Sequence, residues 1–164
     1  MPDVRTPAKN MATVGELTAA LEASSVEFSR VLRSVADRQD YRPDSEHWSF
    51  REIAAHMEAT QVECIYVRIR QIAANARPTF EFYKNDGWDF SDRDLRDSVR
   101  AFNESRGRVI EFARSLSAER LTRTGQHKTF GQLTVGDYLR IDLGHDREHL
   151  DDLNQMIEKL RAQP

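Results

Sequence analysis

The stretch LGHDREHLDD places His145 and His149 four residues apart in a chain that has only five histidines. If this stretch is helical, residues at i and i+4 share one face, so both imidazoles can approach one point. Helical histidines at this spacing bind zinc in several enzyme classes. The same spacing is also typical of a solvated helix surface. A metal site therefore requires a further ligand from elsewhere in the chain.

His56 is the candidate third ligand. It lies in EIAAHMEAT, three residues after Ile53 and eight before Cys64, on or beside the apolar face of a second expected helix. The two C-terminal histidines lie on one helical stripe with Tyr138, Leu153 and Met156. Three imidazoles from two helices leave coordination positions open for water or substrate. The sequence therefore predicts a divalent metal bound by His56, His145 and His149.

Three further side chains are weaker candidates for a role in the site. Asp142 lies one turn before His145, where it either orders a metal-bound water or an imidazole, or makes a structural hydrogen bond. Arg106 interrupts an apolar stripe, where it either binds an anionic group of a thiol cosubstrate or has a structural role. The structural role is favoured, either as a snorkelling side chain or in a buried ion pair. Cys64 is expected to be a small buried hydrophobe rather than a thiolate. No catalytic residue is assigned beyond the candidates Asp142 and Arg106.

The remaining polar residues near these motifs are interpreted as structural. We expect Asp146 and Glu148 to face solvent and to pair with neighbouring arginines, which adds little stability. His47 and His127 are expected on the surface or in an ordering role within loops. His127 lies in the connection that enters the last helix, so it is the one that can reach the open end of the fold.

Composition indicates one globular domain. The chain has 164 residues, of which 39% are hydrophobic and 31% charged, and its net charge is −3. No basic run suggests a nucleic-acid partner, and neither a membrane-spanning run nor a signal peptide is recognisable. Because Cys64 is the only cysteine, no intrachain disulfide can form, and we expect a cytoplasmic protein that acts on a small molecule.

Four apolar-periodic segments predict four helices, over roughly residues 14–37, 50–74, 92–116 and 135–160. Each begins with a hydroxyl cap and an acidic residue three positions later, the pairs being Thr13/Glu16, Ser49/Glu52, Ser91/Asp94 and Thr134/Asp137. The inner face expected of the second helix includes Met57, Cys64, Val67 and Ile72. Such faces are buried only by packing together, which predicts a four-helix bundle. The aromatic-rich loop before the third helix is expected to line a pocket.

The segments HWSFREIAAHMEAT and FGQLTVGDYLRIDLGHDREHLDDLNQM carry a family resemblance. A Trp-Ser helix start, a histidine seven residues after the serine, an FGxLT entry and an HDxxH segment resemble the DinB/YfiT-like superfamily over roughly residues 14–160. The resemblance implies an all-α four-helix bundle with up-up-down-down topology and long crossover loops. It also implies one domain over residues 1–164 with short flexible tails, and a homodimer. The implied metal is zinc or nickel, held by His56, His145 and His149.

The reactions assigned to members of that superfamily vary more than the fold and the metal ligands do. Its members include S-transferases that use bacillithiol or mycothiol, a mycothiol-dependent isomerase, glutathione-dependent transferases, and many proteins assigned as metal-dependent hydrolases. Fold and ligands therefore leave the reaction open. The expectation is a metal-dependent transferase that joins a low-molecular-weight thiol to a small electrophile. The alternatives are a hydrolase that uses a metal-bound hydroxide, and a non-catalytic metal- or ligand-binding stress protein.

Overall fold

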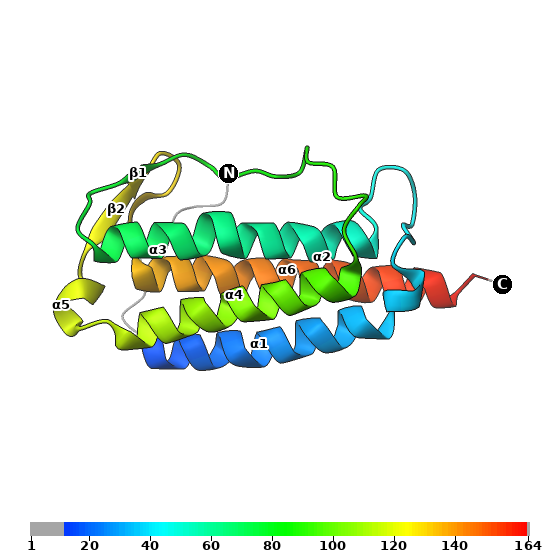
Figure 1. The fold of residues 1–164 in the computed structure, drawn as a ribbon, viewed down its shortest axis with the longest axis horizontal. Coiled ribbons are helices and arrows are strands. Elements are labelled where there is room, and N and C mark those ends of the chain that lie inside the picture. Colours follow the sequence, from blue (N-terminus) through cyan, green and yellow to red (C-terminus); the bar gives the residue numbers. More distant parts are fainter. Residues whose placement is uncertain (1–11, 164) are drawn as a thin grey trace.

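A computed structural model describes residues 12–163; the expected flexible tails, at 1–11 and at residue 164, lie outside the described residues. Four long helical segments pack side by side along the molecule (Figure 1). They are α1 (Val14–Ser34), the continuous run α2 (Phe50–Ala59), η2 (Thr60–Ile65) and α3 (Tyr66–Ala73), then α4 (Leu95–Ser115) and α6 (Val135–Arg161). Short turns η1 (Ala36–Arg38) and α5 (Ala118–Leu121) follow α1 and α4. The predicted four-helix bundle is confirmed.

The helix directions follow the order up-down-down-up, which differs from the expected up-up-down-down order. In Figure 1, α1 and α6 run one way, whereas α2–α3 and α4 run the other. The first connection turns back at once, because the N–H groups of Phe50 and Arg51 donate to the carbonyls of Tyr41 and Gln39. Only the connection over residues 74–94 crosses the length of the bundle, so it alone joins parallel neighbours (Figure 1).

A side chain caps the N-terminus of each of the four long helical segments. Thr13/Glu16, Ser49/Glu52 and Thr134/Asp137 form the predicted reciprocal capping boxes. The prediction at Ser91 is wrong, because Asp94 itself is the cap and its carboxylate accepts from the N–H groups of Arg96 and Asp97. Aspartate is as good a cap as serine, so the helix begins at Leu95, three residues later than expected.

The second helical run contains a π-helical turn, η2, which the sequence did not indicate. A π turn holds one residue more than an α turn, so it shifts the phase of every residue that follows. Val67, expected on the inner face, is therefore 41% exposed. Ile65 and Ile69 take the inner positions instead.

A polar layer divides the core of the bundle. One apolar cluster contains Leu21, Ile69 and Leu139, and a second contains Phe28, Phe102 and Leu153. Each helical segment contributes to both clusters. Between the two clusters, each helical segment carries a buried polar residue of this layer. These residues are Ser25 on α1, Gln61 in η2, Arg106 on α4 and Asp146 on α6. The candidate histidines lie at the same level of α2 and α6.

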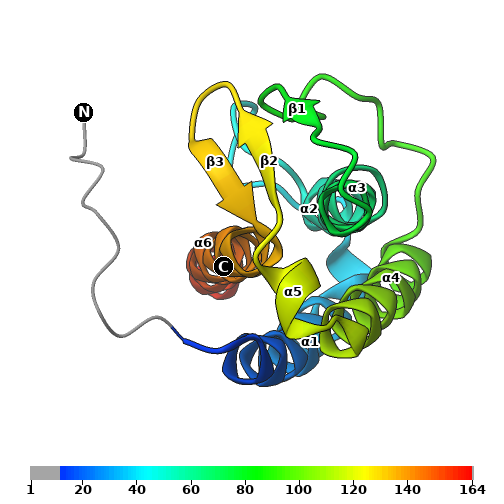
Figure 2. The same ribbon diagram turned by 90° about the vertical axis from the view of Figure 1, so that its left-hand side faces the viewer.

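A small sheet covers one end of the bundle beside α3 and α6 (Figure 2). Its order is β1 (Thr79–Phe80), β2 (Thr124–His127) and β3 (Gly131–Thr134), with β1–β2 parallel and β2–β3 antiparallel. These strands were not predicted, because two to four residues are too few to show a period. The sheet joins the long crossover to the connection that enters α6. Within residues 12–163, no helix is both long and apolar enough to cross a membrane.

Candidate metal centre

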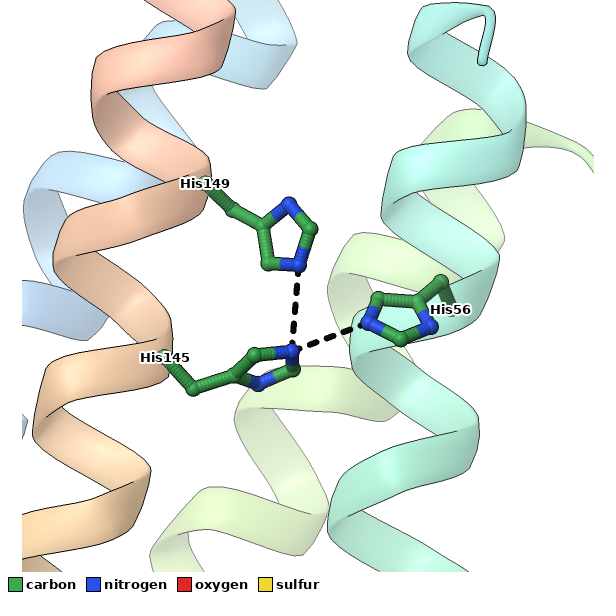
Figure 3. A group of neighbouring side chains, drawn as sticks. All are labelled: His56, His145 and His149. Atoms are coloured by element: carbon green, nitrogen blue, oxygen red, sulfur yellow. Dashed lines mark hydrogen bonds between the residues drawn. The ribbon is translucent and has the colours of Figure 1, made fainter. Parts of the chain in front are cut away.

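The three predicted histidines lie together. Their rings point toward one another from α2 and α6 (Figure 3). The Nε2 atom of His145 lies 2.9 Å from Nε2 of His56 and 3.0 Å from Nε2 of His149. One nitrogen from each ring lies within 4.8 Å of the others. The i, i+4 spacing on α6 and the antiparallel approach of α2 produce this convergence.

Burial keeps these imidazoles neutral near pH 7. It lowers the pKa of His56 to about 4 and that of His145 to about 3, and it also lowers the pKa of His149. Neutral imidazole is the form that offers a nitrogen lone pair to a metal. The buried set is therefore poised to bind a cation rather than to carry protons.

Asn85 fixes the tautomer of His56. The Oδ1 atom of Asn85 can only accept a hydrogen bond, so Nδ1 of His56 carries the proton and Nε2 keeps its lone pair. The Nδ2 atom of Asn85 donates to the hydroxyls of Thr60 and Tyr83, at 3.3 and 3.2 Å, which holds the amide in this orientation. Outer partners of this kind orient metal-binding histidines in known sites. Asn85 comes from the long crossover loop, and no sequence motif indicated it.

The donor set fits a divalent metal. With Nε2 of His56 deprotonated, three nitrogens face one another with too few protons to hydrogen-bond each pair. A cation satisfies all three at once, and neutral imidazole suits zinc and nickel. Nδ1 of His149 has no hydrogen-bond partner among the described residues, although the carboxylate of Asp152 lies 3.6 Å away. Trp48 packs on the His56 ring at a centroid distance of 4.6 Å and covers one side of the set.

A buried ion-pair cluster underlies the histidines. Arg106, which is 1% exposed, donates to both oxygens of Asp146 at 2.8 Å and to Oδ1 of Asp142 at 3.2 Å. The interpretation of Arg106 as a buried ion pair is thus the one the structure shows. The expectation that Asp146 faces solvent is wrong, because it is fully buried between Arg106 and the hydroxyl of Ser24. Glu148 is exposed, as expected.

Asp142 is buried in the same cluster. Its Oδ1 accepts from Gln61 and Arg106, whereas Oδ2 has no hydrogen-bond partner among the described residues. Burial raises the pKa of Asp142 to about 6, although Arg106 acts in the opposite direction. The carboxyl supports the α6 segment that carries His145, and it also lies on the wall of a cavity.

The histidines form part of the wall of a cavity of about 730 Å³. Exposed Phe82 and Phe130, from the two connections joined by the sheet, lie along it. Cys64 also lies on this wall, and burial raises the pKa of its thiol to about 11, so it is protonated near neutral pH. Cys64 is therefore the small buried side chain that the sequence suggested and not a thiolate.

The two remaining histidines differ. His47 is on the surface, where Nδ1 lies 2.6 Å from the carboxylate of Asp44. His127 is 2% exposed and lies on the cavity wall, which confirms that its connection reaches the open end of the bundle. It orders its own turn, because Nδ1 accepts the N–H groups of Thr129 and Phe130.

Comparison with known proteins agrees with the fold. The model of the DinB superfamily matches residues 20–153. YfiT from Bacillus subtilis, described as a probable metal-dependent hydrolase with an unusual four-helix bundle topology, aligns with a TM-score of 0.81 and 17% identity. The alignment covers 97% of this chain and 95% of that chain, and at this identity it shows the fold alone. None of the curated proteins matches the chain. Because the family match spans most of its length, the chain belongs to the DinB superfamily.

Proposed function

We propose that this protein is a divalent-metal-dependent hydrolase of a small molecule, with the metal held by His56, His145 and His149. The observation that carries the proposal is the convergence of three neutral imidazoles on the wall of a cavity of about 730 Å³. Cavities of this size commonly hold small molecules. A metal with open positions lowers the pKa of bound water toward neutrality, which is the chemistry of hydrolysis. The description of YfiT supports this choice over thiol transfer.

The chain's own residues prepare this centre. Asn85 keeps the lone pair of His56 directed at the other two rings. Arg106 carries one positive charge against the carboxylates of Asp142 and Asp146, so the ionised cluster is net negative beside the histidines. Within this cluster Asp146 favours a positive charge at His149, whereas Arg106 acts against one at His145. Phe82, Tyr83 and Phe130 on the cavity wall offer an apolar surface to a substrate.

The test combines elemental analysis with turnover. The full chain is purified, stripped with EDTA, reloaded with zinc or nickel, and assayed against esters, amides and lactams. We expect one equivalent of metal per chain and metal-dependent hydrolysis of one of these classes. The His56→Ala variant is expected to lose both.

The matched control is His47→Ala, which removes a surface histidine that hydrogen-bonds Asp44 and none of the other three histidines. It should keep the metal and the turnover of the wild-type chain. Full metal content and full turnover in His56→Ala would contradict the proposal.

Transfer of a low-molecular-weight thiol is the second candidate. The observation that favours it is the extent of the cavity, which runs past the histidines to Arg68 and His127 and has room for two small reactants. The protonated thiol of Cys64 is a poor nucleophile, so a reacting thiolate has to come from a separate molecule.

The same preparation is therefore assayed with bacillithiol, mycothiol or glutathione and a small electrophile. Turnover that requires the added thiol would favour the transferase over the hydrolase. Metal binding with no turnover in either assay is the outcome expected of a non-catalytic binding protein.

A further inference from the structure

Arg68 lies in the cavity wall at the end remote from the histidines. It follows His56 by about three helical turns on the α2–α3 run, and Tyr138 precedes His145 by about two turns on α6. Because these segments run antiparallel, Arg68 and Tyr138 meet at the same end, where Nη1 of Arg68 donates to the Tyr138 hydroxyl at 3.4 Å. The β2 strand brings His127 to this end of the cavity.

The guanidinium of Arg68 is held in place without a counterion. Nη2 donates to the carbonyl of Glu81 at 2.7 Å, and the guanidinium carbon lies 4.9 Å from the centre of the Phe80 ring. No carboxylate of the described residues lies within ion-pairing distance of Arg68. The nearby carboxylate of Glu81 pairs with Lys128 instead. A positive charge thus faces the cavity with neutral partners only.

His127 and Tyr138 each have a proton to donate on this cavity wall. Nδ1 of His127 accepts the N–H groups of Thr129 and Phe130, at 3.0 and 3.2 Å, so the ring proton is on Nε2. Burial and the charge of Arg68 both lower the pKa of His127, which keeps the ring neutral. The Tyr138 oxygen accepts from Arg68, which leaves its own O–H free to donate.

Charge is distributed unevenly along the cavity. Asp86 and Glu148 lie on its wall with the three histidines, whereas Arg68 lies at the other end with no carboxylate partner among the described residues. An anion is therefore favoured at Arg68.

We propose that Arg68, Tyr138 and His127 form a subsite that binds a carboxylate of the substrate, while the part of the substrate that reacts lies at the three histidines. Arginine with two further donors suits the paired oxygens of a carboxylate. Phe82 and Phe130 lie on the cavity wall beside the His127 ring and favour an apolar body next to the carboxylate. The inference rests on the proposed function, since it assigns that function a carboxylate-bearing substrate.

The test measures the subsite without the metal. The full chain, stripped with EDTA and checked for folding by circular dichroism, is titrated at pH 7.5 with 3-phenylpropionate and with its neutral analogue 3-phenylpropanamide. Because the unloaded histidines are neutral at this pH, they offer no charge to the carboxylate. We expect the carboxylate to bind at least about ten-fold more tightly than the amide, as charge-assisted hydrogen bonds predict.

Variants assign the preference to individual donors. Arg68→Met should abolish the preference for the carboxylate, whereas Arg68→Lys should restore part of it. The matched control is Arg70→Met, because Arg70 stacks on Tyr66 outside the cavity and this change should leave the preference unchanged.

Should Arg68→Met fail to fold, Tyr138→Phe and His127→Asn test the subsite instead. Each removes one donor, Asn keeps an acceptor near the Nδ1 position, and each is expected to weaken carboxylate binding several-fold.

Equal binding of carboxylate and amide by the wild-type chain would overturn the subsite, as would an unchanged preference in Arg68→Met. A loss in His56→Ala as large as that in Arg68→Met would place the carboxylate at the histidines and would also overturn it. The outcome is independent of the proposed function. A carboxylate preference in a chain that binds no metal would refute the hydrolase alone, and metal-dependent hydrolysis without the preference would refute the subsite alone.

Discussion

At the scale of single residues, the contact between Asn85 and His56 determines which nitrogen of His56 can bind a metal. The contact is made by a loop residue 29 positions away in the sequence. It fixes the proton on Nδ1 and leaves Nε2 directed at His145. The ligand set is therefore only complete when the crossover loop is packed against α2.

We predict that Asn85→Ala weakens zinc binding by about 10- to 100-fold, the usual cost of removing an outer partner of a metal-binding histidine. The dissociation constant is measured by competition with a chromophoric chelator. Asn85→Asp keeps an acceptor and should bind nearly as tightly as the wild type. The control Asn103→Ala removes an amide that bonds Ser29 on the far side of the bundle, and it should change nothing. Equal affinities in Asn85→Ala and Asn103→Ala would contradict the assigned tautomer.

A second residue-scale prediction concerns Cys64. With a pKa of about 11, only about one thiol in a thousand is a thiolate at pH 8. A thiol reagent such as Ellman's reagent should therefore modify the folded chain at least about a hundred-fold more slowly than the chain in guanidinium chloride. Comparable rates in the two states would mean that Cys64 is neither buried nor protonated.

At the scale of elements, the π turn η2 lets one helical run serve both apolar clusters. The extra residue keeps Met57 inward before the turn and Ile69 inward after it. It also places Gln61 in the polar layer, where it contacts Arg106 and Asp142. A π turn inside an α-helix is a common feature of functional sites.

Deletion of a single valine tests this account. Removal of Val62, which is 47% exposed within η2, should give a continuous α-helix with both flanking faces still inward, so the chain should keep cooperative unfolding. Removal of the similarly exposed Val67 should rotate the rest of α3 by about 100° and expose Ile69 and Ile72, at a cost of several kcal/mol. Thermal unfolding followed by circular dichroism separates the two. Equal loss of stability would show that η2 has no such role.

The sheet depends on a close approach at Gly125. A Cβ atom there would lie 2.8 Å from Phe80 and 3.1 Å from Ile72. Gly125→Ala should therefore lower the free energy of unfolding by about 1–3 kcal/mol. Gly107→Ala is the control, since it meets no atom within 4 Å in the interior of α4 and should stabilise the helix by up to about 1 kcal/mol. Urea titrations measure both, and a neutral Gly125→Ala would contradict the packing of β1 on β2.

At the scale of the whole molecule, the polar layer connects all four helical segments through charged groups away from water. In this layer Asp142 and Asp146 share the single guanidinium of Arg106. One of the two carboxyl groups is therefore buried without a charge partner of its own, which is unfavourable when it is ionised. The raised pKa of Asp142 means that the folded state binds its proton more tightly than the unfolded state does. Its contribution to stability is therefore present below about pH 4 and is lost as the pH rises through about 6.

We predict a corresponding pH dependence in the difference between wild type and Asp142→Asn. The asparagine does not titrate, and the histidines contribute equally to both chains. From pH 4.5 to 7.5, the unfolding free energy of the metal-free wild type should fall by about 2 kcal/mol relative to the variant. Urea titrations across this range give the difference. A constant or rising difference would mean that Asp142 is not buried as the structure shows.

The helical period predicted all four helical segments, and three of the four capping pairs formed as expected. Helical period and capping boxes predicted the bundle, and the stripe on the last helix predicted that His145 and His149 face inward. Val67 was misplaced because a π turn leaves no mark in a periodic pattern. Asp146 was misplaced because its partner, Arg106, lies on another helix. Arg68 and Asn85 escaped notice because their roles depend on contacts between segments far apart in the chain.

The crossover loop and the hairpin before α6 have a consequence beyond this one protein. The three candidate metal ligands are on the bundle helices, whereas Phe82, His127 and Phe130 are on connections outside it. The connections can therefore vary in sequence while the three histidines stay in place. A library confined to residues 81–84 and 128–130, with Asn85 kept, would vary the cavity wall without changing a strand residue or a candidate metal ligand.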